Sequence, residues 1–249
     1  MTEAATTNRS WWAKATLVGS VIALVLLFLG PVGTRLGIWG FQTGLLLIVP
    51  AGVLLAAIGL LVGLISIFVS KKRGFAGDPP SLFISIAICA LILVSMGLQF
   101  QKGASVPAIH NISTDVVDPP QFTAAIVALR GENSNPLVYN AEELAVTQQG
   151  AYPDVKTLQV SGGVEETVRN AAAALEGMGL EIVTVNEALG LVEATDTTFW
   201  FGFKDDVVVR VRASGDGSLV DVRSVSRVGL SDLGKNADRI LDLLGRLDA

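Results

Sequence analysis

The chain has 249 residues, of which 51% are hydrophobic and only 16% are charged. Soluble globular chains carry about 25% charged residues, so an apolar segment must dilute the charge. Residues 1–100 contain six basic and two acidic residues, whereas residues 101–249 contain 12 basic and 21 acidic residues. The acidic second part argues against nucleic acid as a partner, because phosphate contacts need a basic surface.

Three apolar runs, at about residues 11–30, 41–70 and 80–100, are long enough to cross a hydrocarbon layer of about 30 Å. A cleaved signal peptide is the alternative for the first run, but a second apolar run follows at once. Pro50 interrupts that second run, which we expect to be one tilted or kinked span, because two spans need about 40 residues plus a turn.

The interior of each run lacks ionisable residues, which disfavours a transport role. Gly52, Gly59 and Gly63 are expected to allow close helix packing. The single cysteine, Cys89, lies in the third run, so an internal disulfide or a cysteine-based zinc site is excluded.

Basic residues predict the direction of the spans. Arg9, Lys14 and the run 71–73 lie on one side, and Arg35 and Lys102 lie on the other. The positive-inside rule then places the N-terminus in the cytoplasm and residues 103–249 outside it. We expect a multi-pass protein of the bacterial inner membrane with a periplasmic C-terminal domain.

The predicted domain has an irregular first part and a regular second part. Residues 103–153 are expected to wrap the domain, with an extended stretch at 105–118 and short helices within 121–129 and 141–149. The remaining pattern predicts a strand at 156–160, a helix at 163–178 capped by Ser161 or Gly162, strands at 180–185 and 190–195, a hairpin of 206–213 with 218–226, and a final helix capped by Ser231. The fold class is α+β: three transmembrane helices, then a two-layer antiparallel-sheet domain with two helices on one face, in a helix-grip-like arrangement.

Several linked segments carry a family resemblance. They are ATDTTFWFGFKDDVVVRVR and VDVRSVSRVGLSDLGKNADRI, with IHNISTD, PPQF and AYPDV upstream. Together, over about residues 104–247, they resemble a bacterial and plastid family known as domain of unknown function fourteen-ninety-nine, whose members often begin with membrane helices. One departure is Asn111, where an acid is expected after His110. The resemblance implies a fold and a membrane setting, and no reaction.

The predicted hairpin carries the most suggestive charges. If the Gly215–Gly217 turn keeps an even register, the valines of both strands face the helices, and the opposite face carries Arg210, Arg212, Asp221, Arg223 and Arg227. Such a strip can grip a carboxylate or phosphate by bidentate hydrogen bonds. The favoured interpretation is an open face whose arginines and aspartates pair in water.

Other candidates are weaker. The aromatic residues 199–203, including Trp200, lie beside Asp196 and can form a ligand slot or a membrane-contacting edge, but a core role is favoured. The single histidine, His110, is expected to make a structural hydrogen bond. Asp205 and Asp206 are expected in a turn, where acids are common. We identify no catalytic set, cofactor fingerprint or metal-ligand spacing.

The sequence therefore favours a membrane-anchored extracytoplasmic binding or scaffolding module of the envelope. Its expected partners are the lipid bilayer and an envelope protein, an anionic lipid or a small anionic ligand. One alternative is an envelope enzyme that uses Asp196, Asp205, Asp206 or His110 near the arginines. Another is a structural subunit whose spans dock onto a membrane complex.

Overall fold

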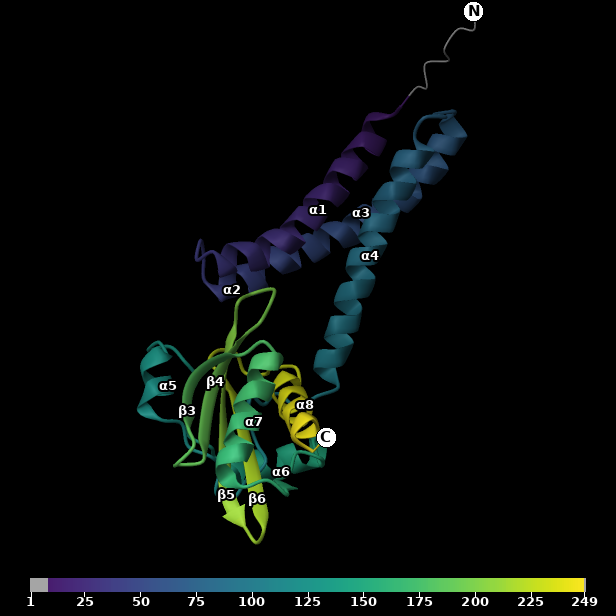
Figure 1. Cartoon of the computed structure of the whole chain (residues 1–249). Coiled ribbons are helices and arrows are strands. Elements are labelled where there is room, and N and C mark those ends of the chain that lie inside the picture. The colour runs from purple at the N-terminus through teal and green to yellow at the C-terminus, as the bar shows by residue number, and fades with distance from the viewer. Residues whose placement is uncertain (1–8, 249) are drawn as a thin grey trace, which may run out of the picture. The chain divides into compact units, whose positions relative to one another are not determined.

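A computed structural model describes residues 9–248. The chain forms two compact units (Figure 1): a helical unit that runs to Gln101 and also includes Trp200–Gly202, and a sheet-containing unit that comprises Lys102–Phe199 and the chain from Phe203 onward. The predicted α+β class, with three long apolar helices before an antiparallel-sheet domain, is confirmed.

The helical unit contains three helices long and apolar enough to cross a membrane, at Trp11–Arg35, Phe41–Arg73 and Pro79–Ala104. The second is continuous through α2 (Phe41–Thr43), a π-helical turn (Gly44–Ile48) and α3 (Val49–Arg73), whereas α1 (Trp11–Arg35) and α4 (Pro79–Ala104) are α-helical throughout. Proline has no N–H to donate, and the π-helical turn ends at Ile48, two residues before Pro50. Each helix extends a few residues past its predicted span, to Arg35, Arg73 and Ala104.

Small residues let the membrane-type helices approach closely. A Cβ atom built on Gly52 of α3 would lie 3.0 Å from the Ala23 carbonyl oxygen of α1, and one on Gly59 would lie 2.9 Å from the Cys89 sulfur of α4. Ala23 and Cys89 are fully buried in this contact. The predicted role of these glycines in helix packing is confirmed.

A buried carboxylate closes one end of this unit. Asp78, in the loop between α3 and α4, accepts hydrogen bonds from the Ser10 N–H (2.7 Å) and from the hydroxyls of Ser10 and Ser70 (2.5 Å each). Burial opposes ionisation, yet these hydrogen bonds outweigh it and lower the pKa of Asp78. The carboxylate therefore ties the start of α1 to the end of α3.

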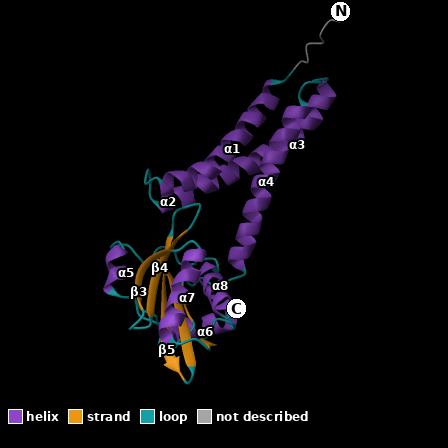
Figure 2. Cartoon of the chain, viewed as in Figure 1, coloured by secondary structure: helices purple, strands orange, loops and turns teal. Residues whose placement is uncertain are grey.

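The second unit is built on a six-stranded antiparallel sheet (Figure 2). Five strands follow the order β1-β6-β5-β4-β3, and β2 also pairs with β6. The strand bounds are Asn111–Ser113, Leu158–Val160, Glu181–Asn186, Leu191–Thr197, Lys204–Ser214 and Gly217–Ser226 for β1 to β6. The strand β1 lies within the stretch predicted only as extended.

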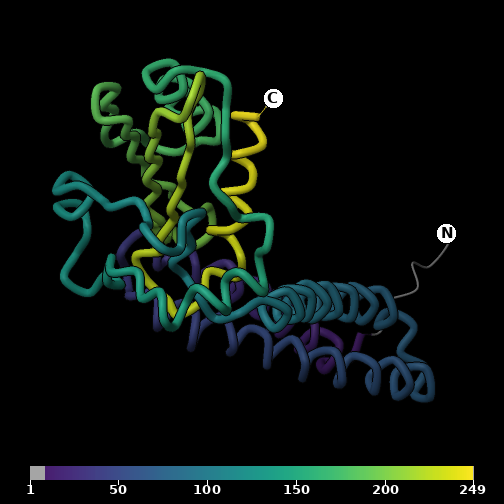
Figure 3. The backbone as a smooth tube through the Cα atoms, turned by 90° about the horizontal axis from the view of Figure 1, so that it is seen from below, coloured from purple at the N-terminus to yellow at the C-terminus, as the bar shows by residue number. Residues whose placement is uncertain are grey.

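Two helices cover one face of the sheet, as predicted. They are α7 (Val164–Gly177) and α8 (Lys235–Leu247), which is yellow in Figures 1 and 3. Their apolar side chains pack on inward-facing valines of β5 and β6 in a single core. On α8, Ala237, Ile240 and Leu243 are buried against the sheet, whereas Leu241 is exposed.

Both predicted helix caps are wrong. The α7 N-cap is Gly163, one or two residues after the predicted Ser161 or Gly162, and no side chain caps it. The α8 N-cap is Gly234, and Asp232, two residues before it, accepts hydrogen bonds from the Gly234 and Asn236 N–H groups, at 2.8 and 2.7 Å. The carboxylate satisfies these free N–H groups better than the predicted Ser231 hydroxyl, which accepts only from Leu233 N–H.

The other face of the sheet is not open to solvent. The wrapping segment, residues 114–157, crosses it and contains α5 (Ala124–Leu129) and α6 (Ala141–Ala151). Gln148 of α6 is fully buried, and its amide bonds to both the N–H and the carbonyl of Ser113 in β1. The segment is thus attached to the sheet by specific polar contacts.

Candidate functional site

The predicted hairpin register is confirmed, and it places ionisable side chains beneath the wrapping segment. Arg210 pairs with Asp221 across β5 and β6, while Val209 and Val222 face the helices. We use the name polar layer for the polar and charged side chains that contact one another between the sheet and the wrapping segment. They are Glu193, Asp206, Arg210, Arg212, Asp221, Arg223 and Arg227 from the sheet side, and Asp115, Asp118, Thr123 and Arg130 from the wrapping segment.

Asp206 is the centre of one ion-pair cluster. Its fully buried carboxylate accepts hydrogen bonds from Arg130, from the Arg227 Nη2 at 2.7 Å and from the Thr195 hydroxyl at 2.9 Å. Burial outweighs the attraction of Asp206 and lowers the pKa of Arg130. Because Arg130 belongs to the wrapping segment, this cluster joins that segment to β5.

The predicted turn at Asp205 and Asp206 is wrong, because both residues lie inside β5 and are buried. Adjacent strand residues face opposite ways, so Asp205 points to the helix side. There the Arg239 guanidinium of α8 bridges Asp205, at 2.8 Å, and Asp196. Asp196 therefore lies on the helix side of the sheet, away from the predicted site arginines of the opposite face.

Arg223 is fully buried and has no acidic partner among residues 9–248. Its guanidinium donates to the Asn111 Oδ1 (3.0 Å), to the Pro120 carbonyl (3.1 Å) and to the Leu137 carbonyl. The rings of Phe122 and Tyr139 lie 5.4 and 5.7 Å from the guanidinium carbon, within cation–π range.

The setting of Arg223 changes its chemistry. Burial lowers its pKa to about 10 and raises the pKa of Tyr139 to about 12. Three neutral acceptors and two ring faces replace water around the charge. Arg223 therefore holds two turns of the wrapping segment in place and is inaccessible to a ligand in this conformation.

Asp221 is the centre of the second cluster. Its buried carboxylate accepts hydrogen bonds from Thr157 (2.6 Å), Arg210 (3.0 Å) and Arg212 (2.6 Å). Burial raises its pKa, but these hydrogen bonds prevail and lower it below the ordinary value. The Arg210 guanidinium also contacts Asp118 of the wrapping segment, at 2.8 Å.

The Asp221 cluster is the part of the polar layer that reaches solvent. The Arg212 side chain is 44% exposed and that of Asp118 is 71% exposed. The predicted open face of water-exposed pairs is therefore wrong for Asp221, Arg223 and Arg227, whose side chains are largely or fully buried. It describes only the exposed edge of the polar layer, which Arg212 and Asp118 form. An anion can reach Arg212 directly and can reach Arg210 by displacing Asp118.

The aromatic run 199–203 does not lie in the core. The residues form the loop between β4 and β5, where Phe199 is 78% and Trp200 is 54% exposed. The expectation of a core role is thus wrong for these two residues. Local hydrogen bonds explain the turn: Thr198 N–H donates to the Phe203 carbonyl at 2.8 Å, and Phe203 N–H donates to the Thr198 hydroxyl at 2.9 Å.

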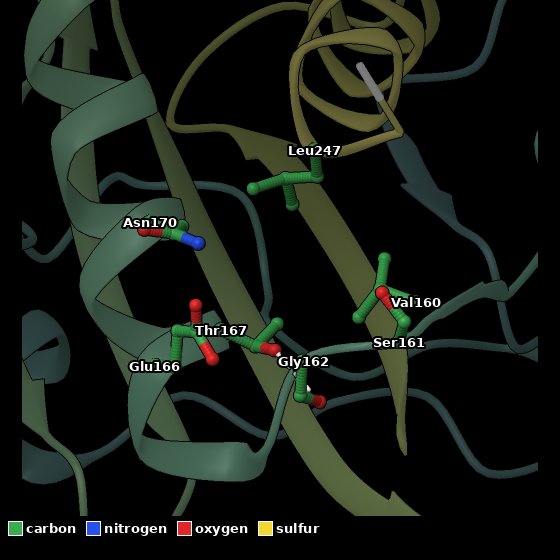
Figure 4. A pocket seen from close by; sticks show the side chains of 7 residues that line it. All are labelled: Val160, Ser161, Gly162, Glu166, Thr167, Asn170 and Leu247. Carbon is green, nitrogen blue, oxygen red and sulfur yellow. Dashed lines mark hydrogen bonds between the residues drawn. The ribbon is translucent and has the colours of Figure 1, made fainter. Parts of the chain in front are cut away.

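A pocket of about 260 Å³ lies between the start and middle of α7, the turn after β2 and the end of α8 (Figure 4). Its lining includes Glu166, Thr167, Asn170 and Leu247. None of the predicted site residues lines it. Because residues of α7 and α8 line the pocket, it lies on the helix side of the sheet, apart from the polar layer.

His110 has a structural contact, as expected. Its Nδ1 lies 3.3 Å from the Leu230 carbonyl oxygen, and its own carbonyl accepts from the Asn236 amide at 3.0 Å. Within residues 9–248, no group of three or more His, Cys, Asp or Glu side chains is arranged to hold a metal ion.

The chain belongs to the family described as protein of unknown function (DUF1499), whose model matches residues 111–247. This confirms the resemblance seen in the sequence. The match spans β1 to α8 and thus the whole polar layer. No curated protein matches the chain.

Sequence reasoning missed Asp115, Asp118 and Thr123 of the polar layer, and it missed three further charged residues. They are Arg130, which pairs with Asp206; Glu193, which accepts from the Thr123 N–H and hydroxyl at 2.6 Å each; and Arg239, which pairs with Asp205. Only Glu193 left a local signal, because it is an acid between buried apolar neighbours in a strand. The other two lie far from their partners in sequence.

Proposed function

We propose that the protein is a membrane-anchored extracytoplasmic binding or scaffolding module of the bacterial envelope, with its partner bound at the exposed edge of the polar layer. The partner chemistry that fits is anionic: an acidic protein surface, an anionic lipid headgroup or a small carboxylate or phosphate. The three apolar helices and the bias of basic residues toward one side support the anchoring and the direction.

One observation carries the binding proposal. Arg210 and Arg212 lie side by side on one face of β5, and one of their counterions, Asp118, is largely exposed. A guanidinium offers paired donors that match a carboxylate or phosphate. An incoming anion would replace the Asp118 carboxylate on Arg210 and would also bind Arg212. The buried Asp221 carboxylate would keep both guanidinium groups oriented.

The buried ionisable groups favour binding over catalysis. Asp206 and Asp221 each form ion pairs with two arginines. A general acid or base must exchange a proton near the working pH, and the lowered pKa of Asp221 works against that. The polar layer is better suited to fixing a surface than to transferring protons.

The test uses the full-length protein in cells, purified through a C-terminal tag after crosslinking of the envelope. Arg212→Glu should abolish a crosslinked partner that the unaltered chain retains, and Asp118→Asn should increase its recovery. Arg169→Glu is the matched control, because Arg169 is an exposed arginine paired with Glu187 outside the polar layer. Equal recovery from the unaltered, Arg212→Glu and Arg169→Glu proteins would contradict the proposed site.

A further inference from the structure

Strand register brings three distant segments to one end of the sheet. Thr197 pairs with Lys204 at the end of the β4–β5 ladder, and the Arg227 N–H donates to the Lys204 carbonyl at 2.9 Å. The Ser226 N–H donates to the His110 carbonyl at 3.0 Å. The loop 198–203, the loop after β6 and the chain entering β1 therefore share this end, opposite the β5–β6 turn (Figure 2).

This end presents exposed apolar side chains. We define the apolar end as Phe199, Leu230 and Leu233, which are 78%, 81% and 42% exposed. Leu233 also has a φ of 56°, in the region that favours glycine. Large side chains at exposed positions of one end, contributed by two loops, form a surface suited to an apolar partner.

The chain connection identifies that partner as lipid. Only residues 105–110 separate the end of α4, a candidate membrane span, from the first residue of β1. Six residues reach at most about 20 Å, and they enter the domain at the apolar end. The short tether from the candidate membrane span therefore joins the domain at its apolar end.

The composition of the apolar end agrees with a lipid interface. An aromatic side chain such as Phe199 offers a large apolar area that can be buried in the membrane interface. Lys204 and Lys235 are exposed beside the loops, at the first residues of β5 and α8. These cations would meet lipid phosphates, although the part of the chain after residue 100 is acidic overall.

We propose that the apolar end inserts into the interfacial layer of the membrane in which the chain is anchored. The loop tips enter among the headgroups, and the domain is held upright instead of moving freely on its tether. The exposed arginine edge near the β5–β6 turn then points away from the bilayer. This inference rests on the membrane anchoring in the proposed function, and it does not depend on the anionic partner.

The test places an environment-sensitive NBD fluorophore on full-length protein in phosphatidylcholine–phosphatidylglycerol vesicles. Single labelling sites are Phe199→Cys, Leu230→Cys and, as the matched control at the opposite end, Asp216→Cys, each combined with Cys89→Ala. Fluorescence is compared in vesicles with and without lipids that carry a nitroxide quencher. Unchanged far-UV circular dichroism shows that the labelled variants are folded.

The expected result is blue-shifted emission and at least a twofold loss of fluorescence from quencher lipids at positions 199 and 230, with neither effect at position 216. Water-like, unquenched emission at all three sites would overturn the proposal. Blue-shifted emission without lipid quenching would also overturn it, because the loop would then contact protein. Resistance of the same protein to extraction at alkaline pH separates these results from a failure of anchoring, in which the whole chain would be released.

Discussion

Substitution of Asp206 by asparagine tests whether the polar layer locks the wrapping segment to the sheet. Asp206→Asn keeps the size of the side chain and removes its charge. The Arg130 and Arg227 side chains, only 5% and 11% exposed, would then be left with no counterion at this carboxylate. Removal of one partner from a buried ion pair costs about 3–5 kcal/mol, because the remaining charge stays desolvated.

The size of this effect is large against the whole stability of a domain. Natural domains unfold with about 5–15 kcal/mol. With a urea m-value of about 2 kcal/mol per molar, a loss of about 4 kcal/mol lowers the unfolding midpoint by about 2 M. The matched control is Asp242→Asn, because Asp242 forms an exposed pair with Arg246 in α8. Such surface pairs contribute about 0–1 kcal/mol.

The assay is urea unfolding of residues 103–249, followed by far-UV circular dichroism and supported by limited proteolysis. This fragment contains the complete hydrophobic core of the sheet domain. Asp206→Asn should also make the wrapping segment the first site of cleavage. If its midpoint lies within 0.5 M of the control, the carboxylate is not a lock and the reasoning is refuted.

The remaining predictions concern pH and helix packing. Because the pKa of Asp221 is lowered, its stabilisation is present above its unfolded-state value of about 4 and is lost as the pH falls through its folded-state pKa. The urea midpoint should therefore fall below about pH 4, and Asp221→Asn should flatten this dependence; an unchanged slope would disprove the assignment. In the helical unit, Gly52→Ala should lower the melting temperature of the full chain in detergent by several degrees, because overpacking costs about 1–3 kcal/mol and the new Cβ would lie 3.0 Å from the Ala23 carbonyl. Gly97→Ala, where no atom lies within 4 Å of the new Cβ, should leave it unchanged, and equal effects of both variants would contradict the packing.

Much of the architecture could be predicted because local patterns specify it. Hydropathy alone determines the three apolar helices. Alternation of valine with charged residues, together with a short glycine turn, determines the hairpin register that pairs Arg210 with Asp221. Helical spacing determines the α7 face that enters the core.

The burial of the charged face could not be predicted in the same way. A strand pattern shows which residues share a face, but it does not show whether another segment covers that face. Arg223 is buried because three acceptors and two rings converge on it from Asn111 and from the wrapping segment 114–157. No regular spacing records such an arrangement.

The capping error at α8 and the aromatic error have local causes. A serine and an aspartate adjoin before α8, and the geometry of the turn selects Asp232 over Ser231. Aromatic residues usually enter cores, but the Thr198–Phe203 hydrogen bonds close a turn that places Phe199 and Trp200 outside.

Cysteine accessibility in spheroplasts tests the central claim, an anchored domain outside the cytosol, most directly. With Cys89→Ala as background, the account predicts that Asp216→Cys reacts with a membrane-impermeant maleimide in intact spheroplasts. Lys72→Cys, in the basic last turn of α3, should react only after the membrane is permeabilised. The reverse pattern would contradict the account, because the sheet domain would then lie in the cytoplasm.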